Sequence, residues 1–351
     1  MYPFKPGHVF VRNAWYVVAL SSEIGEGLLE RRILGETVLL YRSEAGDPVA
    51  LSGLCPHRRM PLAMGRRRGD AVECGYHGIT FDVDGHCVRV PSQTRPSEQM
   101  RLRRYPVAER WQWLWIWTGN PELADPALIP DHAAMGLRDD WEATPVEHYP
   151  VAARYPLLIE NLLDLSHISF LHGSYIEDEA WFSTPVKLTN DGVAHVASRH
   201  SPDSSRSAFH AWMFPDAPER IDQDLRTVFL SPALVYSGPV MSEASPDGRN
   251  GRYLGTMYAI HALTPETQHS THYFSTTTRD FRQGDAAMTE ELHVMDMGVR
   301  MQDVVALGAI EQHLQNDAAL PPEISVAADT PALHIRRVVE TMIAREMANT
   351  N

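Results

Sequence analysis

Two short half-sites, each with one cysteine and one histidine, constrain the fold of this chain most strongly. Cys55 and His57 form the first, and Cys74 and His77 form the second, with sixteen residues between His57 and Cys74. Two thiolates and two imidazoles at this spacing can hold a [2Fe–2S] cluster whose cysteines bind one iron and whose histidines bind the other. Because neutral imidazoles replace anionic thiolates, such a cluster has a raised reduction potential. The half-sites therefore predict two loops that hold a centre for single-electron transfer.

A structural zinc site is the alternative, because zinc accepts the same four ligands. Zinc fingers usually pair cysteine with cysteine and histidine with histidine, whereas each half-site here is mixed, so the iron–sulfur interpretation is favoured. The chain has only three cysteines, which excludes a disulfide scaffold and favours a reducing cytoplasmic location. The remaining one, Cys87, is interpreted as a small buried hydrophobic residue.

Positive charge is concentrated around the half-sites. Residues 1–130 contain 16 Lys and Arg against 14 Asp and Glu, whereas the rest of the chain has a net charge of −16. Five arginines flank the half-sites: Arg58, Arg59, Arg66, Arg67 and Arg68. They suit the docking of an acidic electron donor, although ordinary solvated arginines are the simpler interpretation. The acidic balance of the whole chain argues against a nucleic-acid partner, and no apolar run is long enough to span a membrane.

The first third of the chain has the pattern of short strands separated by turns. Residues 37–41 and 49–51 are apolar and β-prone, and Asp84-Gly85 suits a tight hairpin turn. Four tryptophans alternate with other residues and are predicted to share one strand face: Trp111, Trp113, Trp115 and Trp117. We expect a small all-β domain that presents the half-sites on two loops, followed by a linker over 120–131.

The rest of the chain mixes strands and helices. Helices are predicted over 157–172, 286–315 and 331–347. Strand-like segments lie around 193–198, 226–230, 253–261 and 271–277. Antiparallel strands bracketed by helices predict an α+β domain.

A second group of polar residues lies in the otherwise apolar helix over 157–172. Asn161, Asp164 and His167 recur every three residues, which places them on adjoining positions of one side. His172 follows His167 by five residues, so both imidazoles can reach one metal only if the helix ends or bulges between them. Buried polar groups without partners are costly, so these side chains require an explanation. The sequence favours a second metal site here.

Two histidines need a carboxylate to complete the facial triad of a non-haem Fe(II) oxygenase. The helix over 286–315 has an apolar stripe formed by Leu292, Met295, Val299, Leu307, Ile310 and Leu314. Asp303 lies on this stripe, four residues from Val299 and from Leu307, and a carboxylate pointing into a core is best explained by a cation. Asp296 lies on the same side and remains the rival ligand.

The half-sites, with Gly78 after the last ligand, resemble the motif of Rieske non-haem iron aromatic oxygenases. The similarity is greatest to the group of vanillate O-demethylases, dicamba demethylases and toluenesulfonate methyl-monooxygenases, and it extends over nearly the whole chain. It implies an N-terminal Rieske domain over 1–125 and a catalytic domain of the helix-grip, START-like type over 126–351. It also implies a [2Fe–2S] cluster and a mononuclear Fe(II). The family pattern favours Asp303 as the carboxylate ligand.

The resemblance further implies how such an enzyme is organised. The cluster of one subunit would reduce the iron of its neighbour in a homotrimer, with Asp164 bridging the neighbour's His77 to His167. Asn161 would shape the open side of the iron. The chain lacks dinucleotide and flavin motifs, so NAD(P)H would act only through a separate reductase or ferredoxin.

The expected reaction uses O2 to hydroxylate or O-demethylate a small aromatic substrate of the methoxy- or methyl-benzoate kind. His261 and His272 are candidates to hydrogen-bond an aromatic acid, but each is equally well explained as an ordinary surface or core histidine. Ring dihydroxylation remains an alternative outcome. An alternative from another class is an electron carrier fused to an apolar-ligand-binding domain.

Overall fold

The computed structural model describes residues 9–176, 178–248, 251–316 and 321–348, which form two compact units. The N-terminal unit comprises Arg12–Ile129 with the short segment Thr264–Gln268. The C-terminal unit comprises Pro130–Leu263 and the chain from His269 onward, with the described residues up to Val11. Among the residues searched, no helix is long and apolar enough to cross a membrane.

The N-terminal unit consists of three small antiparallel sheets, so the expected all-β fold is confirmed. The sheets have the strand orders β1-β10-β9, β2-β3-β4 and β5-β6-β7-β8. The strands are β1 (Trp15–Leu20), β2 (Leu29–Ile33), β3 (Glu36–Arg42), β4 (Pro48–Ser52), β5 (Arg66–Arg68), β6 (Ala71–Glu73), β7 (Thr80–Phe81), β8 (Cys87–Arg89), β9 (Val107–Arg110) and β10 (Trp113–Trp117). The predicted segments 37–41 and 49–51 lie in β3 and β4.

The tryptophan stripe belongs to β10 only in part. Trp113, Trp115 and Trp117 lie in this strand and are buried. Trp111 lies in the two-residue loop between β9 and β10 with a φ of 57°, so the prediction that it shares their strand face is wrong. A tight antiparallel hairpin favours a residue with positive φ in its loop, and this requirement overrides the alternation of the sequence.

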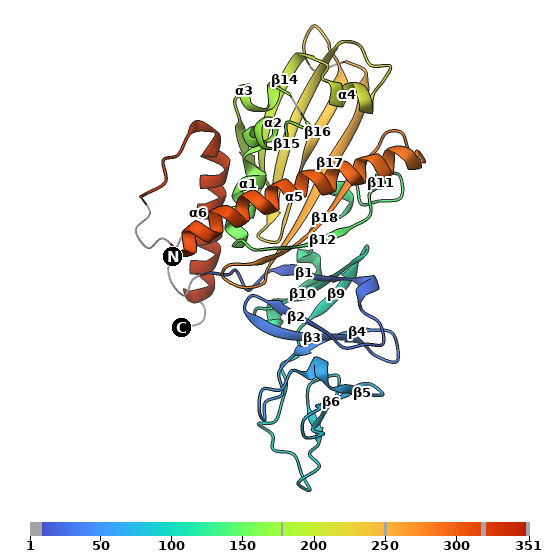
Figure 1. The fold of residues 1–351 in the computed structure, drawn as a ribbon, viewed down its shortest axis with the longest axis vertical. Coiled ribbons are helices and arrows are strands. Elements are labelled where there is room, and N and C mark those ends of the chain that lie inside the picture. The colour runs from blue at the N-terminus through green and yellow to red at the C-terminus, as the bar shows by residue number, and fades with distance from the viewer. Residues whose placement is uncertain (1–8, 177, 249–250, 317–320, 349–351) are drawn as a thin grey trace. The chain divides into compact units, whose positions relative to one another are not determined.

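The C-terminal unit is built on an eight-stranded sheet covered by helices, as the expected α+β class requires (Figure 1). The strand order is β11-β18-β17-β16-β15-β14-β13, and β12 also pairs with β18. The strands are β11 (Glu142–Ala143), β12 (Glu147–Val151), β13 (Lys187–Asn190), β14 (His195–Ser205), β15 (Arg220–Ser231), β16 (Leu234–Glu243), β17 (Tyr253–Pro265) and β18 (Thr271–Arg279). Strand β16 was not predicted from the sequence, because Gly238 and Pro239 interrupt its apolar pattern.

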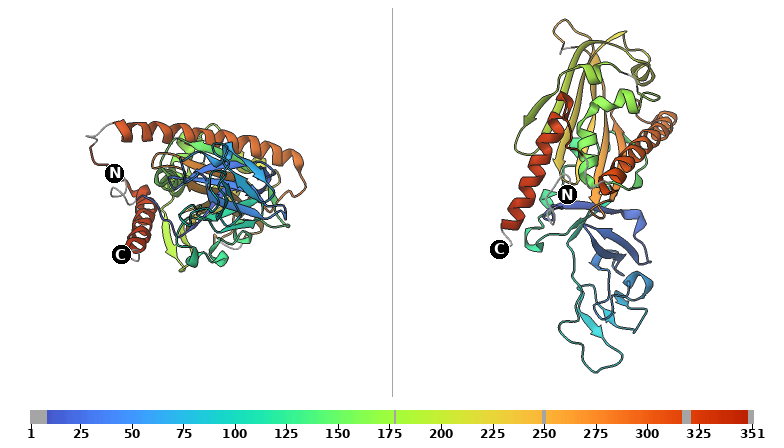
Figure 2. Two further views of the ribbon diagram at one scale, coloured as in Figure 1. Left: turned by 90° about the horizontal axis from the view of Figure 1, so that it is seen from below. Right: turned by 60° about the vertical axis from the view of Figure 1, so that its left-hand side comes forward.

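Six helices accompany this sheet in the described residues. They are α1 (Tyr155–Leu163), α2 (Ile168–Leu171), α3 (Ala180–Ser183), α4 (Ala208–Met213), α5 (Ala286–Asn316) and α6 (Thr330–Ala348). Helix α5 lies along one face of the sheet, and α6 packs against α1 (Figures 1 and 2). The predicted helices over 286–315 and 331–347 are confirmed as α5 and α6.

Helix α5 begins where the Asp285 carboxylate accepts a hydrogen bond from the Met288 backbone N–H at 3.0 Å, an N-cap interaction. Its buried face includes Leu292, Val299, Asp303 and Leu307. Ile310 is 47% exposed, so its predicted place on this face is wrong. The neighbouring Glu311 is buried instead, because it pairs with a buried arginine at the start of α1.

Candidate active site

The predicted helix over 157–172 is divided into α1, a 3₁₀ turn and the short α2. Helix α1 ends at Asp164, which has φ −98° and ψ 93°. The Asp164 carboxylate accepts a hydrogen bond from the Ser166 backbone N–H at 2.9 Å and starts a 3₁₀ turn over Leu165–His167. Short acidic side chains favour such local bonds over a helix interior. In this arrangement the ring centroids of His167 and His172 lie 5.1 Å apart.

Three donor side chains from two parts of the chain converge beside this break. His167, His172 and Asp303 of α5 have ligand atoms that all lie within 4.8 Å of one another. Nε2 of His172 lies 3.2 Å from Oδ1 of Asp303, and Nε2 of His167 lies 3.6 Å from the same oxygen. Two imidazoles and one carboxylate are the ligand set of a mononuclear iron site with open positions. The arrangement therefore fits a divalent cation.

The other nitrogen of each imidazole has its own partner. Nδ1 of His167 contacts the backbone carbonyl oxygen of Asp164, and Nδ1 of His172 donates to Oε1 of Gln302 at 2.8 Å. A protonated Nδ1 leaves the lone pair on Nε2 for a metal. Asn161 donates from Nδ2 to Oδ1 of Asp303 at 3.0 Å, so it fixes the carboxylate.

Burial and charge determine the ionisation of these groups. Burial alone would raise the pKa of Asp303, but the hydrogen bond and charge of His172, with His167 and Asn161, lower the pKa below its usual value. Burial lowers the pKa of His167 and outweighs the attraction of Asp303. A carboxylate beside a neutral imidazole is the protonation state in which both can bind a metal.

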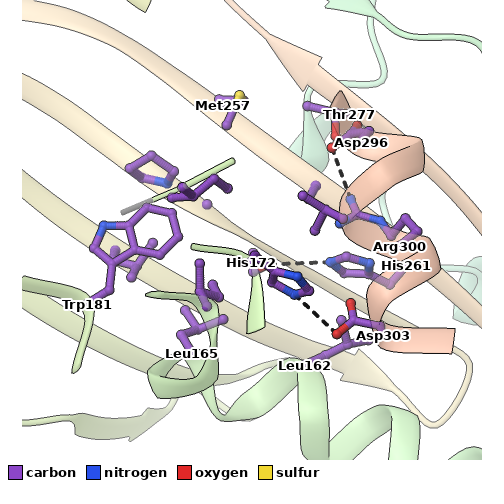
Figure 3. Close-up of a pocket in the computed structure, with 18 of the residues that line it drawn as sticks. Leu162, Leu165, His172, Trp181, Met257, His261, Thr277, Asp296, Arg300 and Asp303 are labelled. Atoms are coloured by element: carbon purple, nitrogen blue, oxygen red, sulfur yellow. Dashed lines mark hydrogen bonds and ion pairs between the residues drawn. The ribbon is translucent and has the colours of Figure 1, made fainter. Parts of the chain in front are cut away.

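A largely apolar cavity of about 70 Å³ adjoins the three donors. Figure 3 shows Trp181 and Leu165 on one side and Asp296, Arg300 and Asp303 of α5 on the other. His261 lines this pocket, whereas His272 does not line it and contacts Nε2 of His148 at 3.1 Å. The structure thus separates the two histidines that the sequence offered as substrate contacts.

The pocket wall also contains an ion pair that is separate from the three donors. Nη2 of Arg300 lies 3.5 Å from Oδ1 of Asp296, and Nε donates to Oγ of Ser275 at 2.9 Å. Arg300 is only 5% exposed, and its Nη2 has no hydrogen-bond partner among the described residues. An unsatisfied buried donor costs about 1–3 kcal/mol. Asp296, the rival ligand, therefore faces an arginine.

The two half-sites of the N-terminal unit form loops with the same backbone pattern. The N–H of Cys55 donates to Met60 and the N–H of Cys74 donates to Ile79, each five residues on. The residues four positions after the cysteines, Arg59 and Gly78, have φ of 58° and 67°. The loops also touch: a Cβ at position 75 would lie 2.7 Å from the carbonyl oxygen of Met64.

The half-site side chains approach one another in two pairs, with the cysteines inside and the histidines outside. Cys55 and Cys74 are buried, whereas His57 and His77 are exposed with their ring centroids 4.6 Å apart. Burial, together with the adjacent Cys74, raises the pKa of the Cys55 thiol to about 11, so a cation is needed to hold the sulfur as a thiolate. This donor set fits a cluster with two sulfur and two nitrogen ligands.

The arginines near the half-sites do not form a uniform basic patch. Arg66 and Arg68 pair with the buried carboxylate of Glu73, and Arg67 lies 5.6 Å from the centroid of the Tyr41 ring. Arg58 and Arg59 are exposed in the loop next to His57. The positive charge available for docking is thus concentrated at the tip of the first loop.

Two residues of the site were missed by the sequence reasoning. Gln302 contacts His172, and Arg300 lines the pocket. A signal exists for Arg300, because Asp296, Arg300 and Asp303 follow one another at steps of four and three along α5. The sequence gives no signal for Gln302, because its role as a hydrogen-bond acceptor follows only from the position of His172 in the structure.

Both units match known proteins. The vanillate O-demethylase oxygenase C-terminal domain matches residues 151–345, and the Rieske [2Fe-2S] domain matches residues 14–106. The chain is 33% identical over 345 residues to the oxygenase component of chloroacetanilide N-alkylformylase from Rhizorhabdus wittichii, covering 96% of this chain and 97% of that protein. It is 34% identical over 349 residues to the oxygenase component of dicamba O-demethylase from Stenotrophomonas maltophilia, covering 97% and 99%. The crystal structure of dicamba monooxygenase bound to 3,6-dichlorosalicylic acid has a TM-score of 0.85 and 30% identity, covering 97% and 99%.

Proposed function

Since the chain belongs to the Rieske non-haem iron oxygenases, we propose that it is a terminal oxygenase component that hydroxylates or O-demethylates a small aromatic substrate. The observation that carries this proposal is the convergence of two imidazoles and a carboxylate at the wall of an apolar pocket. In an O-demethylation, an aryl methyl ether, O2, two electrons and two protons would give a phenol, formaldehyde and water. The electrons come from a separate donor protein, as for other oxygenase components of this family.

We assign the mononuclear iron to His167, His172 and Asp303. Ferrous iron held by these three residues would supply the activation of O2. Gln302 and the Asp164 carbonyl orient the two imidazoles, and Asn161 orients the carboxylate. These hydrogen bonds keep the three donors directed at one point, which increases the affinity for the metal.

We assign the Rieske cluster to Cys55, His57, Cys74 and His77, in a domain over 1–125 that precedes a catalytic domain over 126–351. The cluster supplies electrons one at a time. The exposed His57 and His77 present its histidine-bound side to solvent, where another protein surface can approach. The exposed Arg58 and Arg59 would attract an acidic reductase or ferredoxin to the same tip.

The same tip is proposed to dock on the C-terminal unit of a second copy, in a homotrimer. A hollow in that unit, beside Asp164, is lined by acidic side chains that include Glu160, Glu323 and Asp329. Arg336 lines the same hollow and pairs with Glu160 and Glu323, so the remaining negative charge, on Asp164 and Asp329, complements the arginines of the tip. Asp164 would then bridge His77 of a second copy and His167 by hydrogen bonds. This bridge would give electrons a short route from the cluster of one copy to the iron of the other.

The proposal is tested by metal content and turnover. Three irons per chain, with acid-labile sulfide, support the oxygenase, whereas two irons with an intact cluster spectrum support the electron carrier fused to a binding domain. A panel of methoxylated, methylated and sulfonated benzoates with a surrogate reductase then reports formaldehyde or hydroxylated product. A cis-dihydrodiol as the main product would replace mono-oxygenation by ring dihydroxylation.

A further inference from the structure

The most unusual group in the pocket is the guanidinium of Arg300. It is nearly completely buried, it lines the pocket, and its Nη2 has no hydrogen-bond partner in the part of the chain that the structure describes. A buried charge with an unused donor is costly unless a ligand completes its hydrogen bonds. Arg300 lines the same cavity as the iron-site side chains (Figure 3).

The guanidinium is held in a fixed orientation. Its Nε donates to Oγ of Ser275 at 2.9 Å, and Ser275 also hydrogen-bonds Tyr273. Tyr273 in turn contacts Nδ1 of His261 at 2.6 Å. An arginine anchored in this way loses little side-chain freedom when it binds a ligand, which increases affinity.

Asp296 does not complete the hydrogen bonds of Arg300. Its Oδ1 lies 3.5 Å from Nη2 and forms no hydrogen bond with it, although the opposite charges still attract. A ligand oxyanion that takes the place of Asp296 beside Nη2 therefore breaks no hydrogen bond.

The charges around the pocket also favour an anionic ligand. Asp296, Arg300 and Asp303 line it, and their charges sum to −1. A bound ferrous ion would change this sum to +1, and one carboxylate or sulfonate on the ligand would make it neutral. An arginine is well suited to such a group, because its planar N–H fork matches the oxygens of an acid.

The position of Arg300 sets which end of the ligand it can hold. Arg300 precedes Asp303 by three residues on α5, which corresponds to a rise of about 4.5 Å along the helix. An acid group at Arg300 would leave the ring in the apolar part of the pocket, with another edge directed at the iron-site donors.

We propose that Arg300 is the specificity-determining residue that binds the acidic group of an aromatic carboxylate or sulfonate in this pocket. The inference rests on the proposed function and names the substrate class of the same site. It excludes neutral aromatic amides and ethers as the preferred ligands, because these leave the excess charge of the iron-loaded pocket unbalanced.

The test compares matched acids and amides by calorimetry, using iron-loaded protein without O2. The probes are the three methoxybenzoate isomers, the corresponding methoxybenzamides, and 4-methoxybenzenesulfonate. We expect the best acid to bind the wild-type protein at least tenfold more tightly than its amide. In Arg300→Gln, acid affinity is expected to fall at least tenfold, while amide affinity stays within twofold.

Two further variants keep the test decisive if Arg300→Gln does not fold. Arg300→Lys retains the charge and is expected to keep a preference for the acid, whereas Asp296→Asn removes the competing anion and is expected to tighten acid binding. Equal wild-type affinity for acid and amide, binding of neither, or an equal loss of both in Arg300→Gln would overturn the proposal. Oxygen-dependent turnover of an amide alone would overturn it and leave the oxygenase function intact, whereas absence of a third iron would overturn the function itself.

Discussion

Gln302 is expected to control iron affinity through one hydrogen bond. Nδ1–H of His172 donates to Oε1 of Gln302 at 2.8 Å, and the His172 side chain is only 2% exposed. In Gln302→Leu this N–H would lose its acceptor where water cannot replace it, at a cost of about 1–3 kcal/mol. The proton could then move to Nε2, the atom that must be free to bind metal. Loss of such an orienting partner typically weakens metal binding about 10–100-fold, and we expect a change of this size.

The assay is an anaerobic competition for Fe(II) between a coloured chelator and protein whose cluster is intact. Gln302→Glu retains an acceptor oxygen and adds negative charge, so we expect it to bind iron at least as tightly as the wild type. Gln315→Leu is the matched control, because Gln315 lies on the same helix but donates to Glu311. Unchanged iron affinity in Gln302→Leu, or an equal loss in Gln302→Glu, would refute the orienting role.

Three other predictions concern carboxylates. Asp303→Ala is expected to reduce the iron content from three to two per chain without changing the cluster's absorption; a retained third iron would transfer the ligand assignment to Asp296. Asp164→Asn is expected to keep both metal centres but slow electron arrival in single-turnover measurements, and an unchanged rate would count against the bridge. Glu311→Ala removes the carboxylate that pairs with the buried Arg154 and is expected to cost about 3–5 kcal/mol in urea unfolding at neutral pH. Burial alone would raise the pKa of Glu311, but Arg154 lowers it, so this stabilisation is present at neutral pH and is lost as the pH falls through the lowered pKa. A difference between wild type and variant that is the same at pH 7 and at low pH would contradict the ion-pair explanation.

The parts of the fold that local sequence determines could be predicted well. Each half-site has a cysteine and, four positions later, a residue with positive φ. Gly78 signals this conformation at the second half-site, whereas Arg59 gives no such signal at the first. Helix α5 could be predicted because apolar residues recur along one face and Asp285 starts it. Strand β16 could not, because its interior Gly238-Pro239 pair is typical of turns and only its neighbours β15 and β17 stabilise the strand.

The break at Asp164 shows why the site itself was only partly predictable. Spacing alone required the helix to end or bulge between His167 and His172, and α2 indeed ends at Leu171. The structure has a further break one turn before His167, where the Asp164 carboxylate accepts from Ser166. Because an aspartate can either continue a helix or cap a new turn, the local sequence does not determine which of the two it does. The choice depends on the packing of the following segment, which includes His172 and its contact with Gln302 of a helix far along the chain.

Helix α5 links the chemistry of the site to its choice of substrate. It carries Asp303, which we assign to the iron, and Arg300, which we assign to the ligand, within one turn. Since an α-helix is rigid over this distance, a shift of α5 along the sheet would move both groups together and keep their spacing. Substrate preference is therefore expected to change through substitutions at Arg300 and Asp296 while iron binding is retained, because neither residue contacts His167 or His172 in the described structure.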